Sequence, residues 1–392
     1  MKKSFIVFCS ILLILTKGFA FEWGGVFDNE STIGYDISPN KNGSAEFSFT
    51  QKNGLHVWLS NTLSKDGIWK LNSEVAYIAD INSQPEPVFQ NILDLTLLKV
   101  SGQVPMKKST IDISLGRFFI SDKTENIFST TSDGAYLKFN LSRVGIGGYI
   151  GFTGLLNSLN VNGIFGFNDE SVAQIYKLQY PVVPIILSFD FPSLFANQNL
   201  SFQVLGSIDC GNDVGNKFYG TLLLDGPIYS KLFYTVQTTF GTQNFTNIMN
   251  YTSLNLMWFP LSFANINLGV QYASGNEELK ELKELNGVSY TSVTTTSKES
   301  IKGLPVSDCL LPAASIVFYG GPFYSKFEVK CDLDILNEQG QLFSVRGYYG
   351  KLNSTFNVFS DLQIGLDLNL YINATENQNV LFNAVIKAAF AF

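Results

Sequence analysis

Few residues in this chain have the type and spacing that chemistry requires. His56 is the one histidine, and it stands on the polar side of an alternating stretch. No motif places a nucleophile or a second carboxylate beside it, as nucleophilic or acid–base catalysis would need. The sequence also has no HExxH, no CxxC pair, no EF-hand loop and no phosphate-binding glycine loop. We therefore expect no enzyme activity, no catalytic residue, no metal site and no cofactor.

Charged residues recur instead at every second position of apolar stretches. Between Phe323 and Leu333, for example, Lys326, Glu328 and Lys330 alternate with apolar residues. This spacing places the charges on one face of a strand, and charges cannot face hydrocarbon. The strand phase predicts a wet lumen lined by charges of both signs, which pair in part and give at most modest ion selectivity. The predicted lumen residues are Glu46, His56, Lys70, Glu74, Lys138, Asp190, Lys231, Lys326, Glu328, Lys330, Asp332, Arg346, Asp367 and Lys387.

The cysteines allow one disulfide. Cys210, Cys309 and Cys331 lie beyond the first apolar stretch, and an odd number leaves at least one thiol unpaired within the chain. Cys309 and Cys331 flank the Gly320-Gly321-Pro322 turn at similar distances, so a bridge across a hairpin is predicted there. Buried free thiols are the alternative, because a cross-strand bridge demands a specific geometry.

The elements that carry these side chains are amphipathic strands. From Val380 to Phe392, apolar residues such as Phe382 and Ile386 alternate with Asn383 and Lys387. Such alternation is typical of a strand and not of a helix. From Leu362 to Ile372 every second residue is aliphatic. The alternation breaks at Leu97-Leu98-Lys99 and at Arg117, where we expect β-bulges.

The composition narrows the class of protein. Hydrophobic residues make up 45% of the chain and charged residues 15%, with 34 Phe and 17 Tyr. Residues 1–20 combine Lys2 and Lys3, an apolar stretch and Gly18-Phe19-Ala20, which predicts a cleaved signal peptide. Beyond it no apolar run is long enough for a transmembrane helix. The excess of 33 acidic over 26 basic residues makes nucleic acid an unsuitable partner.

We therefore predict an all-β protein, a transmembrane antiparallel up-and-down β-barrel of about 18 strands (range about 14 to 18) formed by residues 44–392. Short turns should face the periplasm. The long connections 154–181 and 274–310 should lie on the outer side. Residues 21–43 fit an N-terminal periplasmic segment, a plug or an extra strand, and the sequence leaves these alternatives open.

These features together resemble a known family. The signal peptide, the alternating strands from Ser44 onward and the end Ala388-Ala389-Phe390-Ala391-Phe392 are similar to porin-like outer-membrane β-barrel proteins of diderm bacteria. The resemblance implies the outer membrane as the location and its lipid as surroundings. It also implies recognition by the barrel-assembly machinery through the C-terminal strand ending at Phe392. Some barrels of this kind are phospholipases or proteases that use a histidine, which is the enzyme alternative for His56.

Three functions follow as hypotheses. The first is a porin-like channel for passive diffusion of small hydrophilic solutes. The second is a substrate-specific transporter, for hydrophobic solutes among others, with residues 21–43 as a plug. The third is a surface-exposed adhesin or structural barrel that binds a partner through loop 274–310. Homo-oligomerisation is compatible with each of them.

Overall fold

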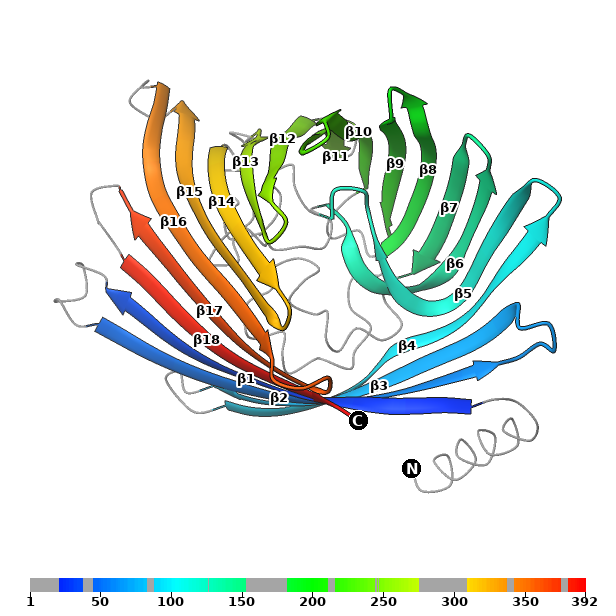
Figure 1. Ribbon diagram of the computed structural model, residues 1–392, viewed down its shortest axis with the longest axis horizontal. Helices are drawn as coiled ribbons and strands as arrows, with labels where there is room; N and C mark the ends of the chain where they lie inside the picture. Colours follow the sequence, from blue (N-terminus) through cyan, green and yellow to red (C-terminus); the bar gives the residue numbers. More distant parts are fainter. Residues whose placement is uncertain are drawn as a thin grey trace.

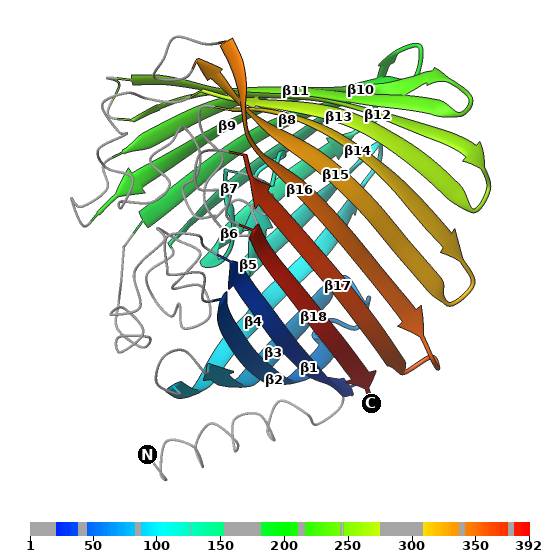
Figure 2. The same cartoon turned by 90° about the vertical axis from the view of Figure 1, so that its left-hand side faces the viewer.

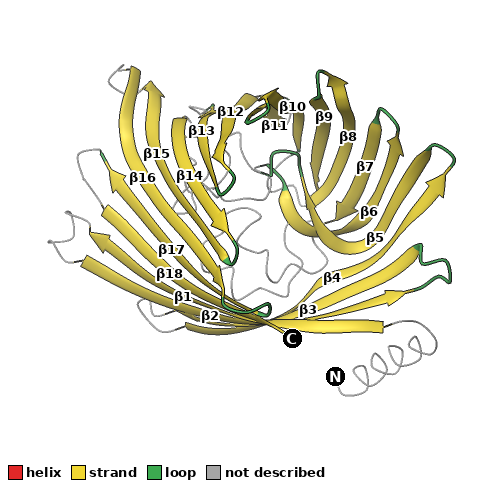
Figure 3. Ribbon diagram, in the orientation of Figure 1, coloured by secondary structure: helices red, strands yellow, loops and turns green. Residues whose placement is uncertain are grey.

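The computed structural model is a closed ring of antiparallel strands (Figure 1). It describes residues 21–37, 45–82, 88–125, 127–152, 182–210, 216–243, 245, 247–274, 309–336, 342–374 and 380–392. Within these ranges strands are joined by turns and loops (Figure 3), and no helix has the length and mean hydropathy of a membrane span. The strands are β1 (Phe21–Ile37), β2 (Ala45–Thr62), β3 (Trp69–Asn82), β4 (Val88–Met106), β5 (Ser109–Ser121), β6 (Ser129–Leu141), β7 (Gly145–Phe152), β8 (Val182–Phe195), β9 (Gln198–Asp209), β10 (Lys217–Tyr229), β11 (Leu232–Gln243), β12 (Asn247–Leu261), β13 (Ala264–Ala273), β14 (Cys309–Gly320), β15 (Phe323–Leu336), β16 (Leu342–Asn357), β17 (Leu362–Asn373) and β18 (Val380–Ala391).

Strand β1 closes the ring. It pairs with β2 along its whole length and with β18 from Val26 to Ile37. At the end of this seam Gly25 and Phe392 exchange two backbone hydrogen bonds of 2.9 and 3.0 Å, and Figure 2 shows β1 beginning beside the end of β18. The other strands pair with their neighbours in sequence. All 18 strands are thereby paired on both sides, as a barrel in lipid requires.

For part of the amino-terminal segment, the structure decides among the three alternatives that the sequence left open. Residues 21–37 form a strand of the wall, which matches the extra-strand alternative and not a plug. Residues 38–44 lie outside the described residues, and so does the predicted signal peptide 1–20.

The outer wall follows from the alternation in the sequence. On β17, Ile364, Leu366 and Ile372 are 45%, 38% and 40% exposed, whereas Asp367 on the other face is 7% exposed. Successive side chains of a strand point to opposite faces. The exposed aliphatic face therefore contacts lipid and the polar face lines the interior, as the sequence predicted for a membrane barrel.

The two ends of the barrel differ in their connections. At the end where β1 begins and β18 ends, β4 and β5 are joined by Lys107–Lys108, β10 and β11 by Ser230–Lys231, and β14 and β15 by Gly321–Pro322. At the opposite end, β7 ends and β8 begins on either side of connection 153–181, and β13 ends and β14 begins on either side of connection 275–308. The connections themselves lie outside the described residues. The prediction of short turns at one end and longer loops at the other is confirmed.

The two predicted bulges have different outcomes. The β3–β4 register shifts between Glu74 and Val75, next to Leu97-Leu98-Lys99, so the first prediction is confirmed. The pairings of β5 show no register shift at Arg117, and the second prediction is wrong. The alternation fails there because Gly116 has a φ of 116°, after which Arg117 and Phe118 are both buried.

Candidate functional site

The loop between β5 and β6 folds into the barrel (Figure 1). Asp122 organises it, because its carboxylate accepts hydrogen bonds from the backbone N–H groups of Thr124, Ile127 and Phe128 and from the Thr124 hydroxyl. Asp122 is 3% exposed. This burial raises the pKa of its carboxyl above the ordinary value, and the hydrogen bonds offset only part of the rise. One acidic side chain thereby fixes the shape of the whole loop.

Apolar packing attaches this loop to the inner face of the wall. Ile127 and Phe128 are 1% and 0% exposed. They belong to a cluster with side chains of five strands, namely Phe118, Tyr149, Ile186, Leu205 and Tyr219. Burial of an aromatic side chain contributes about 2–3 kcal/mol. The loop is therefore held firmly against the wall formed by β7 to β10 and takes up part of the lumen.

A polar group continues the same contact. The Lys123 backbone N–H donates to Gln203 Oε1 at 2.9 Å. Lys123 Nζ and Lys138 Nζ lie 2.7 and 3.2 Å from the two carboxylate oxygens of Asp190. Ser201 donates a further hydrogen bond to Asp190. A cavity of about 570 Å³ lies beside these residues and is lined by Lys123, Glu125, Lys138 and Asp190 among others. The loop thus brings charge, and not only bulk, into the lumen.

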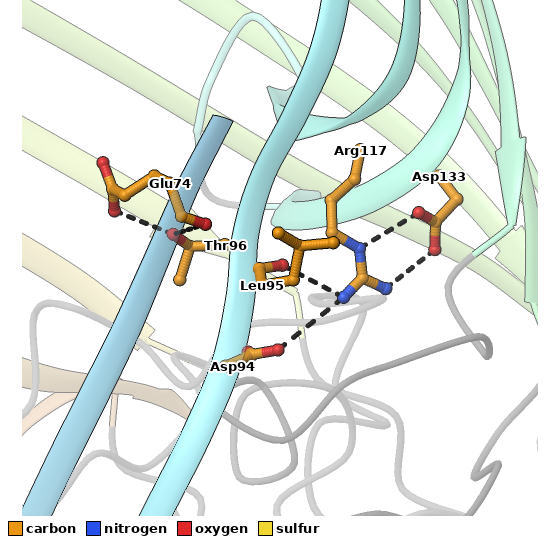
Figure 4. A network of polar contacts seen from close by, with 6 residues as sticks. All are labelled: Glu74, Asp94, Leu95, Thr96, Arg117 and Asp133. Carbon is orange, nitrogen blue, oxygen red and sulfur yellow. Dashed lines mark hydrogen bonds and ion pairs between the residues drawn. The ribbon is translucent and has the colours of Figure 1, made fainter. Parts of the chain in front are cut away.

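A second buried charge group lies on β4, β5 and β6 (Figure 4). Arg117 donates two hydrogen bonds to the carboxylate of Asp133, at 2.7 and 3.0 Å, and one to the carbonyl of Leu95. Its guanidinium is also 3.7 Å from Asp94. Arg117 is 3% exposed and Asp94 7%. Such bidentate pairing fixes the guanidinium in one orientation, so this group stiffens the wall.

His56 lies between two carboxylates. Its Nε2 is 3.3 Å from Asp28 and its Nδ1 is 3.3 Å from Glu74, and Glu74 also accepts a hydrogen bond from the Thr96 hydroxyl at 2.8 Å. These contacts join β1, β2, β3 and β4. His56, the one histidine of the sequence, is therefore a member of a polar group in the barrel wall.

Mixed-sign groups continue around the ring. Lys387 lies 2.8 Å from Asp367 and 3.7 Å from Glu30. On β15, Glu328 lies 3.2 Å from Lys326 and 3.7 Å from Lys330. Arg346 on β16 contacts Asp332 at 2.8 Å. Each group combines acids and bases within one to three neighbouring strands, so the charges compensate one another locally.

The wall from β9 to β14 is different, because its buried polar side chains are mostly uncharged. Thr221 and Thr239 share a 2.8 Å hydrogen bond, and Asn267 donates to Ser315 at 3.1 Å. Where this wall meets β15, a second cavity of about 370 Å³ is lined by amide, hydroxyl and charged side chains. The described lumen therefore combines a wall of ion pairs with a wall of amides and hydroxyls.

The predicted lumen residues mostly occur in these groups. The groups contain His56, Glu74, Lys138, Asp190, Lys326, Glu328, Lys330, Asp332, Arg346, Asp367 and Lys387. Lys70 is an exposed residue of β3, and the side chain of Glu46 on β2 lies outside the described residues. The prediction for Lys231 is wrong. It lies in the turn between β10 and β11, because β10 ends at Tyr229 and a two-residue turn follows.

The predicted disulfide is also wrong, since none of Cys210, Cys309 and Cys331 forms a disulfide within the described residues. The β14–β15 register pairs Leu310 with Leu333 and Ala313 with Lys330, so Cys309 and Cys331 are not opposite each other. Cys331 alternates with the lumen charges Lys330 and Asp332 and therefore lies on the lipid face, whereas Cys309 is buried with Tyr251 and Leu311 on the inner face.

Sequence reasoning missed several residues of the lumen. Asp28 and Glu30 went unnoticed because the segment 21–43 was not assigned to the wall and because their neighbours Asn29 and Ser31 are polar, so no alternation marks this stretch. Arg117 was seen only as a break in the alternation. Lys123 is not among the predicted lumen residues, although Asp122 and Thr124 followed by the apolar pair Ile127–Phe128 are a signal of a folded loop.

Comparisons with solved structures agree with this architecture. OpdQ of Pseudomonas aeruginosa matches with a TM-score of 0.57 and 9% identity, over 95% of this chain and 99% of that chain. OccK5 (OpdH) of the same organism matches at 0.59 and 10%, over 95% and 98%. OccAB4 of Acinetobacter baumannii matches at 0.57 and 11%, over 95% and 98%. No protein-family model and no curated protein matches the sequence.

These neighbours are outer-membrane porins. At such low identity the likeness establishes the fold, and the closed barrel of 18 antiparallel strands is the one they share with this chain. The fold and the polar lumen together are those of a transmembrane β-barrel with a polar interior.

Proposed function

We propose that this protein is an outer-membrane channel through which small hydrophilic solutes diffuse passively. The observation that carries the proposal is the contrast between the two faces of the wall, with apolar side chains toward lipid and amides, hydroxyls and ion pairs toward the interior. A barrel of this strand number is wide enough for an aqueous path. The likeness to porins supports the same function.

The inserted β5–β6 loop supports selection by size. It narrows the lumen beside β7 to β10 and carries Lys123 into it. Because acids and bases lie close together around the ring, the interior offers hydrogen bonds to a passing solute without a strong net field. The transporter alternative with a plug has no support from residues 21–37, since they belong to the wall.

Reconstitution in lipid bilayers tests the proposal. The purified barrel should give ohmic single-channel currents, and liposomes that contain it should swell in small sugars faster than in large ones. A barrel that is folded by circular dichroism but shows neither current nor swelling would refute it. Liposomes with heat-unfolded protein are the control for leakage.

A further inference from the structure

Polar side chains interrupt the lipid-facing side of β1 and β2. They are Asn29 and Ser31 on β1 and Gln51 and Asn53 on β2, which we call the amide patch. Their orientation follows from the alternation, because Phe27, Ile33 and Tyr35 on the same face of β1 are 48%, 39% and 41% exposed. On the other face lie the lumen acids Asp28 and Glu30. The members of the amide patch are themselves half-buried.

The amide patch lies within the apolar belt. Phe27 and Tyr35 bracket it along β1. A strand rises about 26 Å between these two positions, or about 20 Å along the barrel axis for a typical tilt. The hydrocarbon-facing band of such barrels is about 25 Å tall. The patch therefore lies at a depth where water is absent and lipid offers no hydrogen bonds.

Contacts within the patch satisfy only part of its hydrogen-bonding capacity. Asn29 Nδ2 donates to Asn53 Oδ1 at 2.7 Å, and the Ser31 hydroxyl donates to Asn29 Oδ1 at 3.4 Å. Each amide has two donor protons and an acceptor oxygen with two lone pairs. Within the described part of the chain the Gln51 side chain forms no hydrogen bond. Unsatisfied amide groups in hydrocarbon cost free energy, so a partner that supplies donors and acceptors is favoured.

The surroundings of the patch permit close approach. Asn29 is opposite Ala388 of β18, and Asn53 is opposite Ala79 of β3. Small residues beside polar ones are typical of contacts between membrane-embedded elements, because they allow backbones to come together. Elsewhere on the lipid face, bulky side chains such as Phe327 (49% exposed) and Leu268 (53% exposed) project outward.

We infer that the amide patch is the contact between two copies of this chain in the membrane. The amide patch carries no net charge, and its side chains contain both hydrogen-bond donors and hydrogen-bond acceptors. Two copies can therefore pair patch to patch about a two-fold axis, as isologous contacts require. A partner at this depth must itself cross the membrane. A second copy brings the same amides to the same height, whereas acyl chains bring none.

Cysteine cross-linking in native membranes tests this contact. In a chain with Cys210, Cys309 and Cys331 replaced by Ala, Ser31→Cys should form a disulfide-linked dimer on oxidation. Ser325→Cys is the matched control, since Ser325 lies on the lipid face of β15 between the exposed Phe323 and Phe327 and should remain monomeric. Absence of the Ser31→Cys dimer, or a cross-link to a different protein, would overturn the inference.

A second measurement examines the amides themselves. Asn29→Leu combined with Asn53→Leu should weaken self-association in detergent by about tenfold, since interhelical polar contacts of comparable kind contribute about this much. Thr238→Val combined with Thr252→Val removes another hydrogen-bonded pair of the lipid face and should leave the association unchanged. Equal association of the Leu variant and the unsubstituted chain, both folded by circular dichroism, would contradict the inference. Channel currents report separately on the proposed function.

Discussion

At the scale of single residues, the charges of the lumen wall occur in small mixed-sign groups. Arg117 with Asp94 and Asp133, and Lys330 with Glu328, are the more buried ones. A buried charge is costly unless it is paired and hydrogen-bonded. Pairing within the wall therefore allows charged side chains close to the membrane interior while the barrel remains stable.

The Arg117 group gives a test of this view. Arg117→Met should lower the free energy of unfolding by about 3–5 kcal/mol, because it removes the guanidinium that pairs with the Asp133 carboxylate and lies beside Asp94. Denaturant titration in detergent micelles measures the change. Lys326→Met is the control. Lys326 is 34% exposed and its partner Glu328 retains Lys330, so the loss should be about 1 kcal/mol or less. Equal losses in both variants would show that burial of the pair is irrelevant.

At the scale of elements, one glycine turns β5 so that consecutive side chains are both buried. Gly116→Ala should destabilise the barrel by about 1–3 kcal/mol, because a φ of 116° strains any residue with a Cβ, and the added Cβ would clash with the Leu98 carbonyl oxygen. Gly220→Ala is the matched control, since a Cβ there meets nothing within 4 Å. A Gly116→Ala barrel as stable as the control would contradict this role.

The inserted loop makes a separate prediction. Phe128→Ala should weaken docking of the loop by about 3–5 kcal/mol and raise single-channel conductance, because the loop no longer stays against the wall. Phe119→Ala is the matched control. Phe119 lies on β5 and is 60% exposed, so its loss should not change the conductance. An unchanged conductance of a folded Phe128→Ala barrel would show that the loop does not limit the path.

The sequence predicted the elements better than the site. Alternation at Leu362–Ile372 and Phe323–Leu333 identifies strands and faces, because a period of two has few alternative explanations. It does not predict which charges meet, since pairing of Lys387 with both Asp367 and Glu30 depends on the register of three strands. It also did not predict insertion of the β5–β6 loop. That insertion depends on contacts of Ile127 and Phe128 with strands far away in sequence.

At the scale of the whole molecule, the barrel combines closure with local compensation of charge. Closure places every strand between two neighbours, and compensation allows a polar interior without a strong field of one sign. The two features depend on each other at the β1 seam, where Glu30 of β1 contacts Lys387 of β18 and His56 of β2 contacts Asp28 of β1. The seam is therefore joined by side chains as well as by the backbone ladder.

Deletion of residues 21–37 decides whether the amino-terminal segment is part of the wall. If it were a plug, the shortened barrel would fold and conduct more. Because β1 pairs with both β2 and β18, we expect instead that its loss leaves two unpaired strand edges in lipid, where unsatisfied backbone groups cost several kcal/mol each. The shortened chain should then lose its β-sheet circular dichroism signal in micelles and become sensitive to protease. Replacement of Glu30 by Gln and Asp28 by Asn, which keeps the strand and removes only its charges, should leave the fold intact. A folded, protease-resistant barrel without residues 21–37 would contradict the role of β1 in closure.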